Sequence, residues 1–164
     1  MKQPLSAQVA LALLTLLAAC GTTATRANAA PPFTVNTMGG GTFRLAAHRG
    51  KPVVVYFYAS WCGTCVTGAT NLAHFKAAHP NVAVLALDVD PSDTPIMVAQ
   101  FRQMVPDATY LFALDPGGRT AQSYGVKALE ESVVISPGGT LAFHNTTSPT
   151  LSLLDQELAK VTQG

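Results

Sequence analysis

Residues 53–65 read VVVYFYASWCGTC, and this stretch predicts a strand that leads straight into a pair of cysteines. The apolar, β-branched and aromatic run at residues 52–59 is typical of a central strand buried on both faces. Cys62 and Cys65 follow at the start of a helix-like segment, residues 63–79. Free backbone N–H groups and the positive end of a helix dipole favour a thiolate at the first cysteine. We therefore predict a reactive dithiol at a strand-to-helix junction.

Other uses of a C-x-x-C pair fit the neighbouring residues less well. Haem attachment needs a histidine directly after the second cysteine, where Val66 stands. A zinc site needs a second ligand pair, but His74 lies too close to Cys65 in sequence, and His74 and His79 both lie on the expected helix that Cys65 begins. A purely structural disulfide that closes so short a loop would remove little entropy. A peroxidatic cysteine of the peroxiredoxin kind would need Ser or Thr where Ala59 stands. No metal site is expected.

The amino-terminal segment has the pattern of an export signal. An apolar run at residues 9–19 follows Lys2, and its length suits a signal peptide but falls short of the roughly 20 residues of a spanning helix. The run ends in LAACG at residues 17–21, which resembles the lipobox of bacterial lipoproteins. Cleavage before Cys20 would leave its sulfur carrying diacylglycerol. We therefore expect a lipoprotein signal peptide at residues 1–19.

A lipidated, flexible tether is expected at residues 20–32, followed by one domain at residues 33–164. The tether sequence is small, polar and proline-terminated, with no helical or strand period. Its acyl chains would hold the domain on a bacterial membrane, at the periplasmic or outer cell-membrane face. An ordinary signal peptide cleaved near residues 27–29 would instead discard Cys20, and an uncleaved anchor helix would be short.

The rest of the chain alternates strand-like and helix-like segments. Thr94 followed by Pro95 is typical of a helix start, and Gly39 to Gly41 indicate a hairpin turn. This order predicts an α/β domain whose sheet begins parallel and ends in an antiparallel pair. Strands are expected at residues 33–35, 42–45, 52–59, 82–87, 110–114, 132–136 and 140–144, and helices at residues 63–79, 94–105, 119–124 and 151–161.

Composition excludes several classes of protein. The 164 residues suit one domain, and 48% of them are hydrophobic while only 12% are charged, which excludes a highly charged disordered chain. A net charge of +1 supplies no electrostatic basis for binding nucleic acid. The 3 cysteines are an odd number, so at least one has a role other than intramolecular pairing.

Several segments together resemble the thioredoxin superfamily, and within it the membrane-tethered TlpA/ResA-type thiol–disulfide oxidoreductases. The resemblance implies a thioredoxin fold, a mixed central sheet flanked by helices, with an N-terminal β-hairpin and a βα insert. It also implies that Cys62 is the nucleophile and Cys65 the resolving thiol, so the redox-active disulfide replaces a bound cofactor. Trp61 would line the substrate groove, beside the intervening Gly63 and Thr64. The matching segments are residues 53–65 (VVVYFYASWCGTC), 82–89 (VAVLALDV), 91–114, 123–126 (SYGV) and 133–141 (VVISPGGTL).

Two positions depart from the family pattern. Glu130 stands where the family has a cis-proline, and a cis bond before a non-proline residue costs about 3–4 kcal/mol, so we expect a trans or rearranged loop near Cys62. Glu130 and Glu131 near the nucleophile would raise the pKa of Cys62, although a solvated loop pointing away is an equal alternative. Tyr56 occupies the position of the buried acid of thioredoxins.

A proton-transfer acid could come instead from Asp88 or Asp90, at the end of the next strand, since TlpA/ResA-type proteins use a carboxylate from about that region. Both residues could equally be turn or cap residues in the run at residues 88–93. Met97 and Met104 on the insert helix are expected in the core.

The leading hypothesis is a lipid-anchored, monomeric oxidoreductase that acts as a reductase of exported protein cysteines. The family resemblance implies substrates of the cytochrome c or copper-site maturation type and a membrane electron donor such as a CcdA/DsbD-like protein. Two alternatives remain. The pair could act as a disulfide-forming oxidase, or it could hold Cu(I), since soft thiolates suit that ion.

Overall fold

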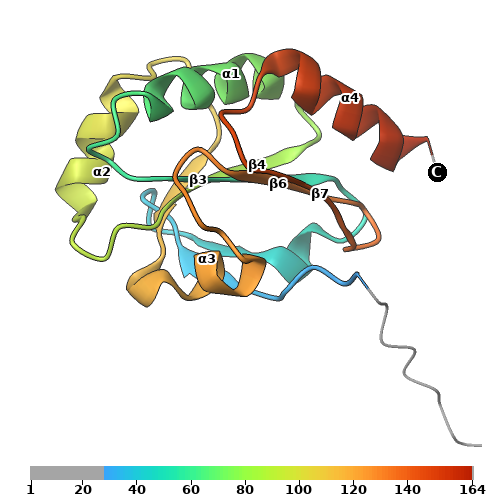
Figure 1. Ribbon diagram of the computed structural model, residues 1–164, viewed down its shortest axis with the longest axis horizontal. Helices are drawn as coiled ribbons and strands as arrows, with labels where there is room; N and C mark the ends of the chain where they lie inside the picture. Colours follow the sequence, from blue (N-terminus) through green and yellow to red (C-terminus); the bar gives the residue numbers. More distant parts are fainter. Residues whose placement is uncertain (1–27, 164) are drawn as a thin grey trace, which may run out of the picture.

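A computed structural model describes residues 28–163 of the chain. A five-stranded sheet in the order β5-β4-β3-β6-β7 forms its centre (Figure 1). Strand β3 (Val53–Tyr58) runs parallel to β4 (Ala83–Asp88), and β4 parallel to β5 (Leu111–Leu114). On its other side β3 pairs antiparallel with β6 (Ser132–Ile135), which pairs antiparallel with β7 (Leu141–Asn145). The sheet is therefore mixed, as the sequence predicts.

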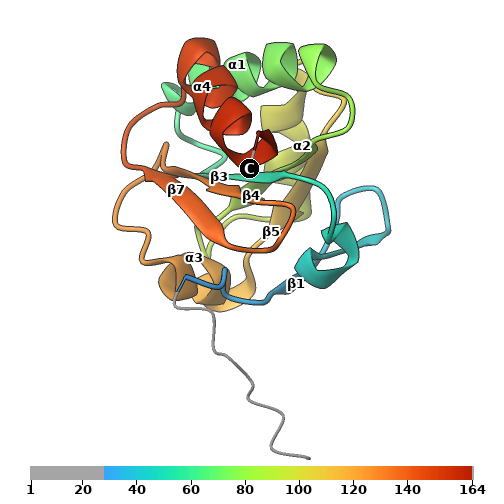
Figure 2. The same ribbon diagram turned by 90° about the vertical axis from the view of Figure 1, so that its right-hand side faces the viewer.

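The helices lie on both faces of this sheet (Figures 1 and 2). One face is covered by α1 (Cys65–Ala78), α2 (Pro95–Gln103) and α4 (Leu151–Thr162). The opposite face is covered by α3 (Arg119–Tyr124) and by the amino-terminal segment. That segment comprises a separate two-stranded hairpin and a short 3-10 helix; a second 3-10 helix precedes α3. Their bounds are β1 Thr34–Asn36, β2 Thr42–Arg44, η1 Leu45–His48 and η2 Pro116–Gly118.

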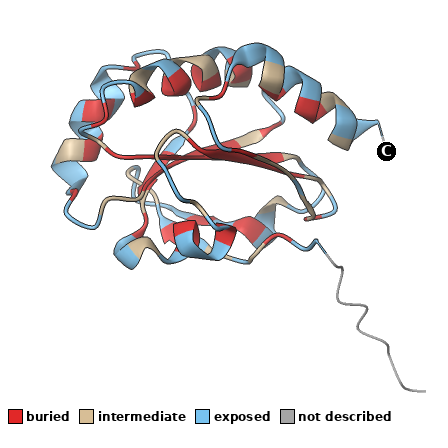
Figure 3. Ribbon diagram, in the orientation of Figure 1, coloured by how far each residue is buried: buried red, intermediate tan, exposed pale blue. Residues whose placement is uncertain are grey.

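Strand β3 is buried along its whole length because helices cover both of its faces (Figure 3). Alternate side chains of a strand point to opposite faces, so its residues divide between two cores. Val54, Tyr56 and Tyr58 join the core under α1, α2 and α4. Val53, Val55 and Phe57 join the core formed with α3 and the hairpin. The continuous apolar run in the sequence is thus explained by burial on both sides.

The expected elements are confirmed, with small shifts at their ends. Helix α1 begins at Cys65 because the two residues before it form a turn, and α2 ends at Gln103. The hydroxyl of Thr94 accepts the backbone N–H of Met97 at 3.4 Å, which confirms the predicted helix start. The thioredoxin-like fold, with its amino-terminal hairpin and its βα insert of α2 and β5, is therefore the fold of this chain.

The described part of the expected tether, residues 28–32, is held against the domain, which corrects the prediction for these residues. The N–H of Ala30 donates to Gly139 O at 3.0 Å, and the carbonyl of Asn28 accepts the N–H of Leu141 at 2.8 Å. The hydroxyl of Tyr124 donates to Pro31 O at 2.8 Å. Residues 28–32 have small side chains and no helical or strand periodicity, so this edge pairing could not be predicted from the sequence.

The predicted signal peptide and the predicted lipidation site Cys20 lie outside the described residues. Within residues 28–163, no helix combines the length and the apolar character needed to cross a membrane.

Candidate active site

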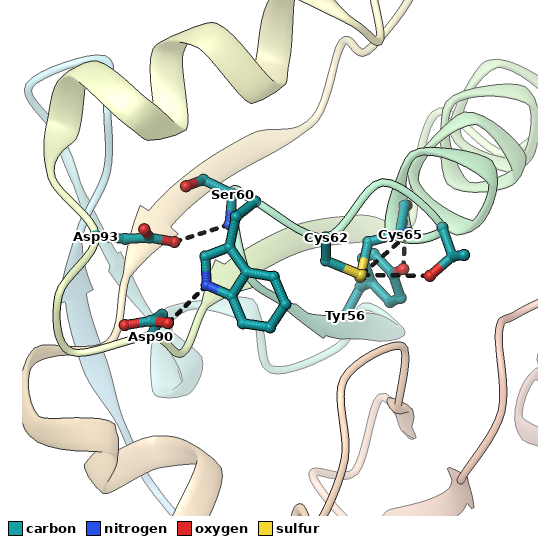
Figure 4. The surroundings of a disulfide bond; sticks show 8 residues. Tyr56, Ser60, Cys62, Cys65, Asp90 and Asp93 are labelled. Atoms are coloured by element: carbon teal, nitrogen blue, oxygen red, sulfur yellow. Dashed lines mark hydrogen bonds between the residues drawn. A yellow bond between two sulfur atoms is a disulfide. The ribbon is translucent and has the colours of Figure 1, made fainter.

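Cys62 and Cys65 form a disulfide where β3 ends and α1 begins (Figure 4). The two sulfur-bearing residues differ in access: Cys62 is 8% exposed, whereas Cys65 is completely buried. Trp61, directly before the pair, is 63% exposed. An incoming thiolate can therefore reach Cys62 more readily than Cys65, beside a large apolar surface.

The turn around the disulfide presents donors to the sulfur of Cys62. The backbone N–H of Cys65 donates to Cys62 Sγ at 3.2 Å, and Thr64 Oγ1 lies 3.5 Å from the same sulfur. Thr64 is the N-cap residue of α1, and the first turn of this helix holds no acidic residue. Gly63 is exposed and open to solvent. Once the disulfide is reduced, these donors stabilise a thiolate at Cys62.

Tyr56 lies beneath the start of α1 and supports it with its phenol. Its hydroxyl donates to Cys65 O at 3.1 Å. Gly68 has no side chain, and the Tyr56 ring occupies the space that a Cβ at position 68 would need. Burial, and after it the nearby Glu130 charge, raises the pKa of Tyr56 far above its ordinary value. The phenol therefore stays protonated, so it holds the helix start without exchanging a proton.

Glu130 occupies a β-bulge beside the end of β3. Its N–H donates to Phe57 O at 2.9 Å, while the N–H of Phe57 donates to Glu131 O at 2.9 Å. Glu130 and Glu131 thus both lie opposite Phe57. Glu130 has φ +70°, the positive value that a G1-type bulge requires at its first position. All peptide bonds within the described residues are trans. The expected trans, rearranged loop is confirmed, with a glutamate in a conformation that favours glycine.

The side chain of Glu131 fits neither of the two sequence alternatives, because it is not solvated and it is bound to His144 on β7 instead of to the cysteines. Glu131 is buried, and its Oε2 lies 2.6 Å from His144 Nε2 on β7. Its Oε1 accepts the backbone N–H groups of Lys127 at 2.9 Å and Ala128 at 2.8 Å. Burial raises the pKa of Glu131, but these donors outweigh burial and hold the pKa below its ordinary value. Of the two glutamates, Glu130 is the one whose charge raises the pKa of Tyr56.

The loop between β4 and α2 contacts the residues just before the cysteines. Asp90 Oδ2 accepts the indole N–H of Trp61 at 2.6 Å, and Asp93 Oδ2 accepts the backbone N–H of Ser60 at 2.8 Å (Figure 4). The hydrogen bond from Trp61, and after it that from Ser92, lowers the pKa of the half-buried Asp90. Asp90 is thus a carboxylate that holds the tryptophan.

Asp88, the other predicted acid, is buried at the end of β4. Its Oδ1 accepts the N–H of Asp90 at 3.1 Å. Burial, opposed by this hydrogen bond and reinforced by Asp93, raises the pKa of Asp88 to about 7. Among the described residues, neither Asp88 nor Asp90 forms a hydrogen bond with Cys62 or Cys65, so a direct proton transfer to sulfur stays a prediction.

Ser60, Gly68 and Asp93 are site residues that the sequence reasoning missed. The signal for Asp93 was its place in the acidic run after β4, because parallel neighbours such as β3 and β4 end at the same edge of a sheet. Gly68 carried no signal, since only the position of Tyr56 shows why a side chain is excluded there.

Metal ligation finds little support in the described part of the chain. Residues 28–163 hold no group of three or more His, Cys, Asp or Glu residues that could bind a metal ion.

Met97 is half-buried, and Met104 is 51% exposed, which corrects the expectation that both lie in the core.

The fold and the site define the class of protein. A C-x-x-C disulfide at the β3–α1 junction of a thioredoxin-like sheet, with one sulfur accessible, is the site of a thiol–disulfide oxidoreductase. Its two-electron chemistry resides in the disulfide itself.

Comparison with known proteins agrees with this class. Residues 27–144 match the AhpC/TSA family, and the chain belongs to this family. It is 30% identical to "Thiol-disulfide oxidoreductase ResA" of Bacillus thuringiensis subsp. konkukian over 135 residues, 81% of this chain and 76% of that protein. It is 31% identical over 120 residues to "Mercury resistance operon ORF3" of Streptomyces lividans, 71% of this chain, and it spans only 63% of that protein.

A solved structure shows the same architecture. A secreted Mycobacterium tuberculosis disulfide oxidoreductase, described as homologous to Escherichia coli DsbE, superimposes with a TM-score of 0.68 at 25% identity. The match covers 78% of this chain and 95% of that one. The chain is therefore a thioredoxin-like thiol–disulfide oxidoreductase with ResA-like and DsbE-like relatives.

Proposed function

We propose that this protein is an extracytoplasmic, lipid-anchored reductase of exported protein disulfides. The observation that carries the proposal is the contrast within the disulfide, because Cys62 reaches the surface beside the exposed Trp61 while Cys65 is enclosed. Attack at Cys62 and resolution by Cys65 follow from this contrast.

The reaction has two exchange steps. The reduced Cys62 thiolate attacks one sulfur of the target disulfide, which forms a Cys62–target mixed disulfide and releases the other target sulfur as a thiolate. Deprotonated Cys65 then attacks Cys62 Sγ, which forms the Cys62–Cys65 disulfide and releases the second target thiolate. Each released thiolate takes a proton from water. The target gains two electrons, and a dithiol donor returns them to the pair.

The surroundings of the pair support the reducing direction. Gly63 and Thr64 offer no cationic side chain, and the hydrogen-bond partners of Cys62 Sγ within the described residues are the neutral Thr64 hydroxyl and the Cys65 N–H. Glu130 adds negative charge on the cysteine side of the sheet. A Cys62 thiolate without a cationic partner is less stabilised than one beside a cation, so the oxidised disulfide form of the pair is favoured. The reduced pair therefore tends to donate its electrons to a target disulfide.

Location and partners belong to the same proposal. The lipobox-like LAACG at residues 17–21 supports an anchor at Cys20, and a relative described as secreted supports an extracytoplasmic site. A monomer on the membrane would draw electrons from a membrane donor of the CcdA/DsbD kind. Its substrates would be cysteines of exported proteins, of the cytochrome c or copper-site maturation type.

The reduction potential of the full-length chain, equilibrated against thiol buffers, tests the direction. We expect a value near that of thioredoxin, about −270 mV, whereas a value near about −120 mV would make the protein an oxidase. A pair that resists reduction below about −300 mV would be a structural disulfide and would overturn the proposal.

Three variants separate the chemistry from the anchor. Cys65→Ser should accumulate mixed disulfides with exported proteins, while Cys62→Ser should form none. Cys20→Ser should release the protein from the membrane fraction without changing the potential. Equal trapping by both active-site variants would contradict the assignment of Cys62 as nucleophile.

A further inference from the structure

Three buried polar atoms cluster at the end of β3 and β4 beside the active site. Within the described residues, Tyr58 Oη, Asp88 Oδ2 and Asp93 Oδ1 have no hydrogen-bond partner. Tyr58 and Asp88 are paired across the two strands, and Asp93 comes from the loop that follows β4. Tyr58 is fully buried, Asp88 is 1% exposed and Asp93 is 9% exposed. Such a group of unpaired atoms is costly to bury and calls for an explanation.

One proton supplies the missing hydrogen bond. Two ionised carboxylates can only accept, so facing oxygens from Asp88 and Asp93 repel each other. The side chain of Asp93 lies within hydrogen-bonding reach of Asp88 if one of them is protonated. The protonated oxygen then donates to the other carboxylate, as in other carboxylate pairs that share a site.

We propose that Asp88 and Asp93 share one proton, and that this acid pair positions the Ser60–Trp61 segment in front of Cys62. The proposal rests on the proposed function, because that segment precedes the nucleophile. Asp93 links the two parts: its Oδ1 is one of the three unpaired buried atoms, and its Oδ2 accepts the N–H of Ser60 at 2.8 Å. Figure 4 shows Asp93 and Asp90 on the same side of this segment, where Asp93 is directed at Ser60 and Asp90 accepts the indole N–H of Trp61.

Loss of the proton would loosen this positioning. Asp88 is part of β4 and is fixed by the sheet, whereas Asp93 lies in the loop before α2. Two charged carboxylates therefore separate by movement of Asp93, and Ser60 loses its acceptor. Burial raises the pKa of Asp88 to about 7, which places the change near neutrality. Asp93 is consequently a positioning residue whose grip weakens as pH rises.

The other titratable groups facing the pair do not change charge near neutrality. They are Tyr58 on β3, with Tyr110 next to it just before β5, and Asp90 in the loop. Burial raises the pKa of both tyrosines far above neutrality, so they stay protonated. The hydrogen bond from Trp61 lowers the pKa of Asp90, so it stays ionised. A transition near neutrality at Trp61 therefore reports the acid pair.

Trp61 is the single tryptophan of the chain, so its fluorescence reports this segment directly. In the oxidised full-length protein we expect a change of emission with a midpoint near pH 7. Asp88→Asn should abolish the transition and keep the emission of the acid form, because the amide donates permanently to Asp93. Asp93→Ala should show the emission of the alkaline form at every pH. Asp107→Asn, at an exposed acid in the loop after α2, is the matched control and should keep the transition.

Several results would overturn the proposal. A wild-type protein without a transition, or an Asp88→Asn variant that retains it, removes the shared proton. If the midpoint of the transition differs between calcium chloride and EDTA, a metal ion and not a shared proton joins the two carboxylates. The experiment does not require turnover, so it stands apart from the reductase assay. A clear transition in a protein with the potential of a structural disulfide would refute the proposed function alone.

Discussion

Two acidic segments border the active site, and they treat their buried carboxylates in opposite ways. In residues 130–131, Glu131 is surrounded by donors, two backbone N–H groups and His144. In residues 88–93, Asp88 receives one backbone N–H and otherwise faces another carboxyl group. The same kind of side chain thus has a lowered pKa in the first segment and a raised pKa in the second. The arrangement of donors, more than burial, decides the charge of a buried acid.

The largest expected effect is on the pH dependence of stability through Asp88. The pKa of this group is 3.8 in the unfolded reference and about 7 in the folded state. The folded protein therefore keeps a proton that the unfolded chain has lost. The stability that this proton provides is full below the unfolded pKa and is lost as pH rises through about 7, a decline of up to about 4 kcal/mol.

Asp88→Asn should flatten this decline in urea unfolding measured between about pH 4 and pH 8, with the disulfide intact. Asp107→Asn, at an exposed position, should follow the wild-type curve. Parallel curves for Asp88→Asn and the wild type would remove the contrast between the two segments.

The next largest effect is expected for Glu131→Ala, which leaves His144 and two backbone N–H groups without their acceptor. We expect a loss of about 3 kcal/mol in unfolding free energy at neutral pH. Glu131→Gln should cost less, about 1 kcal/mol, because the amide oxygen still accepts both N–H groups. The sign of the pH dependence is opposite to that of Asp88: the contribution of Glu131 is present above its unfolded pKa and is lost as pH falls. Urea unfolding checks both, and equal costs for Ala and Gln would contradict this account.

A smaller effect is expected at Gly68, under the phenol that lies between the two acidic segments. A Cβ at position 68 would stand 2.6 Å from Tyr56 Oη and 2.9 Å from its Cζ. Gly68→Ala should destabilise the protein by a net of about 1–2 kcal/mol, since overpacking exceeds the gain in helix propensity. Adding Tyr56→Phe should recover about 1 kcal/mol in a double-mutant cycle. Gly63→Ala, with open space around it, should change stability by less than about 0.5 kcal/mol. If the effects of Gly68→Ala and Tyr56→Phe on stability are strictly additive, the Tyr56 phenol is not the group that opposes a side chain at position 68.

The smallest effect on stability is expected for Asp90→Asn. Asp90 is half-buried, but its hydrogen bond with Trp61 is exposed to solvent, and an exposed hydrogen bond contributes little to the folding free energy. The emission of Trp61 should change at all pH values, because its indole loses a charged acceptor, while the transition near neutrality persists. Fluorescence titration together with urea unfolding checks this. Loss of the transition in Asp90→Asn would assign the titration to Asp90 instead of the buried pair.

Much of the fold could be predicted because its signals are local. Strand β3 is a continuous apolar run, and the start of α2 has a Thr-Pro pair. The pairing of residues 28–32 with the turn at Gly139 could not be predicted, since edge pairing carries no periodicity. The bulge at Glu130 was equally hidden. The departure from proline was visible, but only the hydrogen bonds to Phe57 show how the chain accommodates a glutamate there.

The sequence by itself determined that the chain forms an α/β domain with a dithiol at a strand-to-helix junction. Those features follow from side-chain periodicity and from residues adjacent in the chain. Only the tertiary structure decided which acids are buried, which are charged and what they hold. Asp93 meets Ser60 across 33 positions of sequence, and Glu131 meets His144 across 13. A pKa depends on desolvation and on partners from other elements, and neither exists until the chain has folded.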